Sequence, residues 1–123
     1  IDSERYLLTC GRYVDQNPMR ARMVTNPAEF KWSSFSARAG IAECPFLDLD
    51  PAVAALSPRP ARRAEMYRAL AATPLLEADL ELIRGASQRN QLTGDDAFVV
   101  RVESEQGIAV PSRPRGRPRK SRE

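Results

Sequence analysis

Prolines that follow a polar residue divide this sequence into short segments and limit the length of any helix or strand that it can form. The pairs that mark segment boundaries are Asn17-Pro18, Asn26-Pro27, Asp50-Pro51 and Thr73-Pro74. A residue before proline avoids the α region, and proline itself has no N–H to donate. Each pair therefore ends one helix or supplies the cap and first residue of the next.

The segments between these breaks have the composition of helices. Apolar residues make up 42% of the 123-residue chain and are mostly Leu, Val, Ala and Met, with few β-branched or aromatic runs. This composition favours helices packed on helices, so we predict a mainly α chain of several short helices and a disordered basic tail. The longer helices are expected at about 3–16, 61–72, 77–89 and 95–105, with Leu80, Ile83 and Ala86 directed inward.

The first helix has the most informative face. Ser3 is its expected cap, and it should end before Pro18. Tyr13 and Asn17 are four residues apart, so their side chains should lie one above the other. On a neighbouring face of this helix we expect a buried stripe formed by Leu7, Cys10, Gly11 and Val14.

After the first helix, three aromatic residues are expected to anchor the chain in the core, and a glycine is expected to end a helix. The anchors are Phe30, Trp32 and Phe35, and the helix stop is Gly40.

Charge and composition exclude several classes of protein. Residues 111–123 hold six Lys/Arg and one acid, so the tail is strongly basic although the chain carries only +3. Such a tail favours a polyanionic partner, most often nucleic acid. Cys10 and Cys44 without any histidine do not form a zinc site, and they fit reduced apolar positions better than a disulfide. No apolar stretch is long enough to span a bilayer, so no membrane partner is expected.

The segment Pro114–Lys120, "PRGRPRK", has the chemistry of a DNA-binding arm. The narrow minor groove of A·T-rich DNA attracts inserted arginines, here Arg115 and Arg117. Gly116 allows close approach of the backbone, Pro114 and Pro118 keep the flanks extended, and Arg119 and Lys120 can reach phosphates. The segment resembles an AT-hook. The alternative is a generic basic tail that binds nucleic acid without preference.

Tyr13 allows a catalytic interpretation and a structural one. A tyrosine can act as a nucleophile on phosphorus, with a divalent metal neutralising the phosphate, and an amide one turn away could face the same site. However, a half-buried tyrosine on an amphipathic helix is usually part of the core, and Asn before Pro is usually a helix stop. Spacing alone favours the structural interpretation.

A family resemblance shifts this balance. The run Tyr6–Gly40 reads "YLLTCGRYVDQNPMRARMVTNPAEFKWSSFSARAG" and resembles the REP-associated tyrosine transposases, which are single-tyrosine, HUH-type enzymes. Weaker similarity continues in order through "LDLDPAVAAL", "RRAEMYRAL", "LELIRGASQRNQLTGDDAFVVRVE" and "RGRPRK". The resemblance implies an α+β, ferredoxin-like parent domain with a helical C-terminal extension. Residues 1–40 would end that domain, 41–107 would form the extension, and 108–123 the basic tail.

The resemblance also implies site residues and chemistry. Tyr13 corresponds to the nucleophile, Asn17 to a position that joins the metal site, and Arg12, Arg20 and Arg22 lie near substrate phosphates. The implied reaction cleaves and rejoins single-stranded DNA at palindromic hairpins through a 5′-phosphotyrosine, with Mg²⁺ or Mn²⁺. The implied location is the bacterial cytoplasm, at the nucleoid.

The sequence departs from the family at the metal site. The family's two ligand histidines lie on an upstream strand, and this sequence contains no histidine. We therefore expect the C-terminal part of such a transposase, inactive alone, whether through truncation, incomplete sequence or decay. Asp15 and Gln16 replace a common Glu-Leu pair, and Gln16 is expected at an exposed or decayed position. Two alternatives remain open: a small non-enzymatic DNA-binding regulator, and a helical interaction module with an incidental basic tail.

Overall fold

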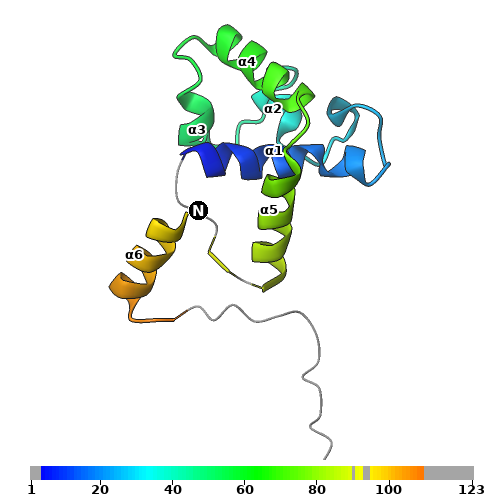
Figure 1. The fold of residues 1–123 in the computed structure, drawn as a ribbon. Helices are drawn as coiled ribbons and strands as arrows, with labels where there is room; N and C mark the ends of the chain where they lie inside the picture. The colour runs from blue at the N-terminus through cyan, green and yellow to red at the C-terminus, as the bar shows by residue number, and fades with distance from the viewer. Residues whose placement is uncertain (1–3, 90, 93–94, 110–123) are drawn as a thin grey trace, which may run out of the picture.

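The computed structural model of the chain describes residues 4–89, 91–92 and 95–109. Over these residues all regular secondary structure is helical, which confirms the prediction of a mainly α chain (Figure 1). The elements are α1 (Glu4–Arg20), the 3₁₀ turn η1 (Pro27–Glu29), α2 (Phe35–Arg38), α3 (Pro51–Ala54), α4 (Pro60–Ala72), α5 (Glu77–Arg89) and α6 (Asp96–Gln106). No helix within these ranges combines the length and apolar content needed to cross a bilayer.

Most helix ends lie where the polar-proline pairs and caps place them. The Asn26 side chain accepts from Ala28 N at 2.9 Å, and Asp50 Oδ1 accepts from Val53 N at 2.9 Å. Gly40 follows α2 with φ of 67°, the left-handed conformation that suits glycine at a helix stop. The bounds of α5 agree with the prediction, and its Leu80, Ile83 and Ala86 are buried as expected.

The predicted end of the first helix was wrong, because α1 continues through Pro18 to Arg20. Proline removes one donor from the ladder, but here its ring is buried, and burial offsets part of that cost. The last turn is closed by Ala21 N donating to Asn17 O at 2.8 Å and Met23 N donating to Pro18 O at 2.9 Å. Tertiary packing thus overrides the local preference of the residue before proline.

Helix α1 lies at the centre of the molecule, with α2, α3 and α4 on one side of it and α5 on the other (Figure 1). The core is a cluster of buried side chains from α2, α3 and α4, against which Leu8 of α1 packs. Its members are Phe35, Ala39, Val53, Tyr67 and Ala71. The core contains residues from before and after position 40. The division into segments 1–40, 41–107 and 108–123 stays a prediction. Residues 110–123, and with them most of the basic tail, lie outside the described residues.

The predicted buried stripe of α1 was also wrong. Val14 is 58% exposed, and Leu7, Cys10 and Gly11 are only half-buried. The buried residues of this helix are instead Thr9, Asp15, Gln16 and Pro18. Apolar spacing misidentified the face because two of these buried residues, Asp15 and Gln16, are polar and find polar partners on another helix.

Only one of the three predicted aromatic anchors is buried. Phe35 is 6% exposed and belongs to the core, whereas Phe30 is half-buried and Trp32 is 77% exposed. Helix α2 begins at Phe35 and turns that ring inward, while Trp32 precedes the helix on a loop over the surface. The expectation that Trp32 anchors the core is therefore incorrect.

Candidate nucleic-acid interface on helix α1

Tyr13 lies on α1 beneath a cation. The ring is half-buried, and the guanidinium carbon of Arg20 lies 4.2 Å from its centroid, within the range of a cation–π contact. Arg20 also donates from Nη2 to the Tyr13 carbonyl at 2.8 Å. Burial lowers the pKa of Arg20, and the positive charge of Arg84 lowers it further, while Tyr13 acts in the opposite direction. The structure thus holds a positive charge against the phenol.

The Asn17 side chain is exposed one helical turn after Tyr13. Its backbone remains helical even though Pro18 follows, so the i to i+4 relation that the sequence predicts with Tyr13 is kept. Both side chains are therefore carried by one uninterrupted stretch of α1. This preserves the face on which the resemblance places its catalytic pair.

The other two arginines predicted near substrate phosphates have separate environments. Arg12 is half-buried and donates from Nη2 to the Thr73 carbonyl at 2.6 Å, which ties α1 to the segment between α4 and α5. Burial lowers its pKa, against the effects of Tyr67 and Asp79. Arg22 is exposed just beyond α1, with φ of 58°.

Two of these guanidinium groups each have a buried nitrogen without a hydrogen-bond partner in the described part of the chain. Arg12 Nε and Arg20 Nη1 are buried and have no hydrogen-bond partner among the described residues. An unpartnered buried donor carries a desolvation cost, and because these nitrogens are covered, the side chains would have to move for them to reach an anionic oxygen. This applies to Arg20 beside Tyr13 and, separately, to Arg12 two turns earlier on the same helix.

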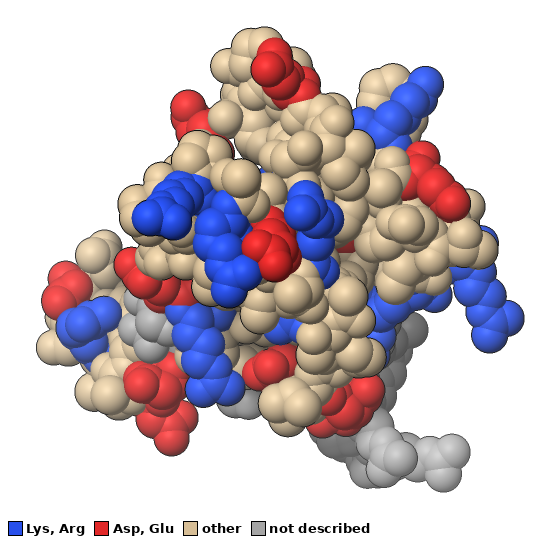
Figure 2. All heavy atoms as spheres, turned by 90° about the horizontal axis from the view of Figure 1, so that it is seen from above, with Lys and Arg blue, Asp and Glu red and all other residues tan. Residues whose placement is uncertain are grey.

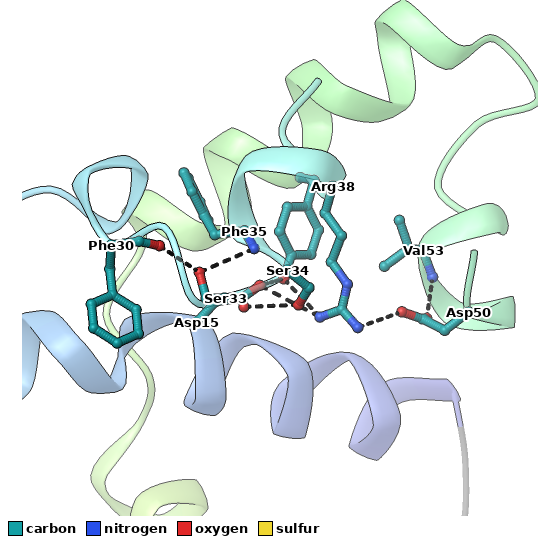
Figure 3. Close-up of polar contacts among 9 residues, drawn as sticks. Asp15, Phe30, Ser33, Ser34, Phe35, Arg38, Asp50 and Val53 are labelled. Carbon is teal, nitrogen blue, oxygen red and sulfur yellow. Dashed lines mark hydrogen bonds and ion pairs between the residues drawn. The ribbon is translucent and has the colours of Figure 1, made fainter. Parts of the chain in front are cut away.

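Behind this face, a buried carboxylate organises the neighbouring helices. Tyr67 Oη donates to Asp15 Oδ2 at 2.5 Å. Ser34 Oγ donates to Asp15 Oδ1 at 3.1 Å (Figure 3). Arg38 Nη1 lies 3.4 Å from Asp15 Oδ2, and its Nη2 lies 3.0 Å from Asp50 Oδ2. We call Asp15, Ser34, Arg38, Asp50 and Tyr67 the Asp15 network. It joins α1 to α4, α2 and the cap of α3.

The structure contradicts the expectation for Gln16. The side chain was expected at an exposed or decayed position, but it is 5% exposed and donates from Nε2 to the Ala71 carbonyl at 2.8 Å and the Thr73 carbonyl at 3.1 Å. It satisfies carbonyls at the end of α4, where the helix ladder has stopped. A leucine there would leave them without this donor, so Gln16 suits this position.

The absence of a side chain at Gly11 leaves space for the Arg38 guanidinium of the Asp15 network. A Cβ at Gly11 would come within 2.8 Å of Arg38 Nη1, so a side chain there would displace the guanidinium. Sequence reasoning assigned Gly11 to an apolar stripe and missed Asp15, Arg38 and Tyr67 as a group. No local pattern links them, since Asp15 and Tyr67 are 52 positions apart.

The residues present do not fit the divalent metal that the resemblance implies. Within the described ranges, no three His, Cys, Asp or Glu side chains gather where they could hold a metal ion. Mg²⁺ and Mn²⁺ take six ligands in octahedral geometry, and even where waters fill several positions, protein sites for them use one or two carboxylates, whereas Asn17 offers a single neutral amide oxygen. We therefore derive no catalytic step through a metal.

Charges on the helical body are mixed. On the face seen in Figure 2, Lys and Arg side chains alternate with Asp and Glu. This face does not offer the single-sign surface typical of proteins that bind duplex DNA broadly. The basic tail residues predicted to contact DNA, Arg115, Gly116, Arg117, Pro118, Arg119 and Lys120, lie outside the described residues.

Comparison with known proteins adds no relative. No protein-family model matches the chain, and no curated protein or solved structure is significantly similar to it.

Proposed function

We propose that this chain is a DNA-binding protein of the REP-associated tyrosine transposase type, acting at the bacterial nucleoid. The observation that carries the proposal is the pairing of Tyr13 with Arg20 on α1, one turn from the exposed Asn17 amide. A phenol, a guanidinium and an amide on one helical face suit contact with a DNA phosphate. The quoted sequence run around Tyr13 supports the same assignment.

The proposed activity is binding of single-stranded hairpin DNA, without cleavage by this chain as it stands. Cleavage in the family, as the resemblance implies it, depends on two histidines that this sequence does not contain. In an enzyme that has those histidines, Tyr13 would attack the phosphate. In this chain, Tyr13 would help to position the strand. Arg20 and Arg12 would supply the electrostatic attraction.

The basic tail would add a second, distinct mode of binding. Arg115 and Arg117 have the spacing for insertion into an A·T-rich minor groove, so the tail would prefer duplex DNA while α1 contacts the unpaired strand. A non-enzymatic regulator with the same two elements is the second candidate. The observation that favours it is the well-satisfied Asp15 network, which gives the helical body a core of its own.

The test compares two DNA ligands by fluorescence anisotropy at several salt concentrations. The full chain should bind both a single-stranded hairpin and an A·T-rich duplex, each more weakly as salt rises. Arg20→Gln should weaken hairpin binding and lower the salt slope by about 0.7, the value for one phosphate contact on a single strand. Replacement of Arg115 and Arg117 by Ala should weaken duplex binding instead.

The matched control for α1 is Arg62→Gln, because Arg62 is an exposed arginine of α4 that pairs with Glu65. It should leave hairpin binding unchanged. If neither DNA binds above the level of a neutral protein, the proposed function is wrong. If hairpin binding persists unaltered in Arg20→Gln, the assignment of α1 as the contact surface is wrong.

A further inference from the structure

Trp32 is a large aromatic side chain presented to solvent on a loop between η1 and α2. It is 77% exposed, although tryptophan is usually well buried. Its neighbours in the sequence are mostly polar: Glu29 and Lys31 are exposed, and Ser33 and Ser34 are half-buried, while the one apolar neighbour, Phe30, is itself half-buried. A protein-binding surface needs a contiguous apolar centre, which an isolated ring among polar side chains does not provide. A single flat ring is instead suited to stacking with one planar group.

The loop that carries Trp32 is held firmly at both ends. Ser33 Oγ donates to the Phe30 carbonyl and accepts from Phe35 N, each at 3.3 Å (Figure 3). Ser34 Oγ donates to the buried Asp15 carboxylate at 3.1 Å, and Phe35 is part of the core. The backbone on either side of Trp32 is therefore fixed while its ring points outward. A ring held in this way loses little freedom when a ligand stacks on it.

A cation lies against the same ring. Lys31 Nζ lies 4.6 Å from the Trp32 ring centroid, while the tryptophan as a whole is 77% exposed. Nucleic acid presents this combination of partners, because a base stacks on an aromatic ring while the adjoining phosphate pairs with a cation. Ser34 also connects the loop to Asp15, only two residues after Tyr13, so a base held here would have a fixed position relative to α1.

From these observations we propose that Trp32 is a stacking platform for an unpaired base of single-stranded DNA, with Lys31 at the neighbouring phosphate. This inference rests on the proposed function, which it deepens by naming how the unpaired strand is held. Bases stack on aromatic side chains without sequence preference, so the platform would grip the strand rather than read it.

Trp32 is the only tryptophan in the chain, so its own fluorescence reports on the stacking. Titration of the full chain with a single-stranded oligothymidine of about 12 nucleotides, within the usual site sizes, should quench this fluorescence. The A·T-rich duplex should bind through the tail, as seen by anisotropy, and leave the fluorescence unchanged.

Substitutions then separate stacking from charge. Trp32→Ala should weaken oligothymidine binding by about 5- to 100-fold, and Trp32→Phe should retain most of the affinity. Trp32→Ala should leave the salt slope unchanged, whereas Lys31→Gln should lower it by about 0.7. Phe46→Ala is the matched control, since Phe46 is 90% exposed on a segment without Lys or Arg, and it should have no effect.

Three results would overturn the inference. If oligothymidine binds without quenching and Trp32→Ala binds as tightly as wild type, the platform is wrong while the proposed function stands. If the chain binds no DNA of either kind, both are wrong. If the fluorescence changes with protein concentration alone and Trp32→Ala removes that change, the ring belongs to a contact between copies of the chain.

Discussion

An aspartate caps a helix both in the body formed by α1 to α4 and in α6. However, the two parts are stabilised by different contacts. In the body, Asp15, Arg38 and Tyr67 meet from three helices that are distant in sequence. Helix α6 buries none of its residues and lies away from α2, α3 and α4 in Figure 1. Among its contacts, Asp95 caps the helix, Arg101 lies over Phe98, and Gly107 ends it.

This difference separates two sources of stability. The body depends on polar groups that are satisfied only when distant helices are in place, so its contacts should be lost together. Helix α6 has a local aspartate cap and no buried residue, so we expect it to open and close without the rest. Single substitutions can test that separation, and the largest effect is expected in the body.

Asp15→Ala should cause the largest loss. It removes the acceptor for Tyr67 and Ser34 and one partner of the largely buried Arg38, so we expect a loss of about 3 kcal/mol in unfolding free energy. Urea denaturation followed by circular dichroism measures this change. Asp48→Ala, at an exposed aspartate in the loop before α3, is the control and should cost little. A loss in Asp15→Ala as small as the control's would mean that the network does not hold the body.

Tyr67→Phe should cause a smaller loss that depends on pH. It removes one buried hydrogen bond, so we expect a loss of about 1 to 2 kcal/mol at neutral pH. Burial and the hydrogen bond to Asp15 raise the pKa of Tyr67, against the opposing effect of Arg38. The native state then holds the phenolic proton more tightly than the unfolded state, so stability is full below the unfolded pKa of about 10 and falls as pH rises above it.

The measurement is unfolding free energy between neutral pH and the highest pH at which unfolding stays reversible. The wild type should lose its advantage over Tyr67→Phe as pH rises above about 10. Tyr13→Phe removes a phenol outside the Asp15 network, so it should leave the decline in place. If the unfolding free energies of wild type and Tyr67→Phe change in parallel with pH, folding does not raise the pKa of this phenol.

The same division between local and distant contacts explains what the sequence could predict. Caps and stops act over three or four residues, and the predictions from Asn26, Asp50 and Gly40 were confirmed. The bounds of α5 were predicted because its apolar spacing and the break at Pro74 agree. Where cap, spacing and break all point to one structure, sequence reasoning is reliable.

The predictions that failed on α1 concern residues whose partners are far away in the sequence. Taken alone, a carboxylate and an amide at positions 15 and 16 are expected in water. Their burial depends on Tyr67 and on the Ala71 and Thr73 carbonyls, more than fifty positions later. The proposed site shows the same limit, because the order of residues placed Tyr13 and Asn17 on one helix but gave no indication that Arg20 covers the phenol.

The smallest global effect is expected from Asp95→Ala. Removing this cap should weaken α6 by about 1 kcal/mol and reduce the protection of its amides in hydrogen exchange, without a measurable change in unfolding of the body. Asp50→Ala is the matched variant, because Asp50 caps α3 with nearly the same geometry, 2.9 Å to Val53 N against 2.8 Å from Asp95 to Phe98 N. Asp50 also pairs with Arg38, so its loss should destabilise the whole body. Equal global effects of the two variants would mean that α6 belongs to the same cooperative unit as the body, since two identical caps can differ only through what surrounds them.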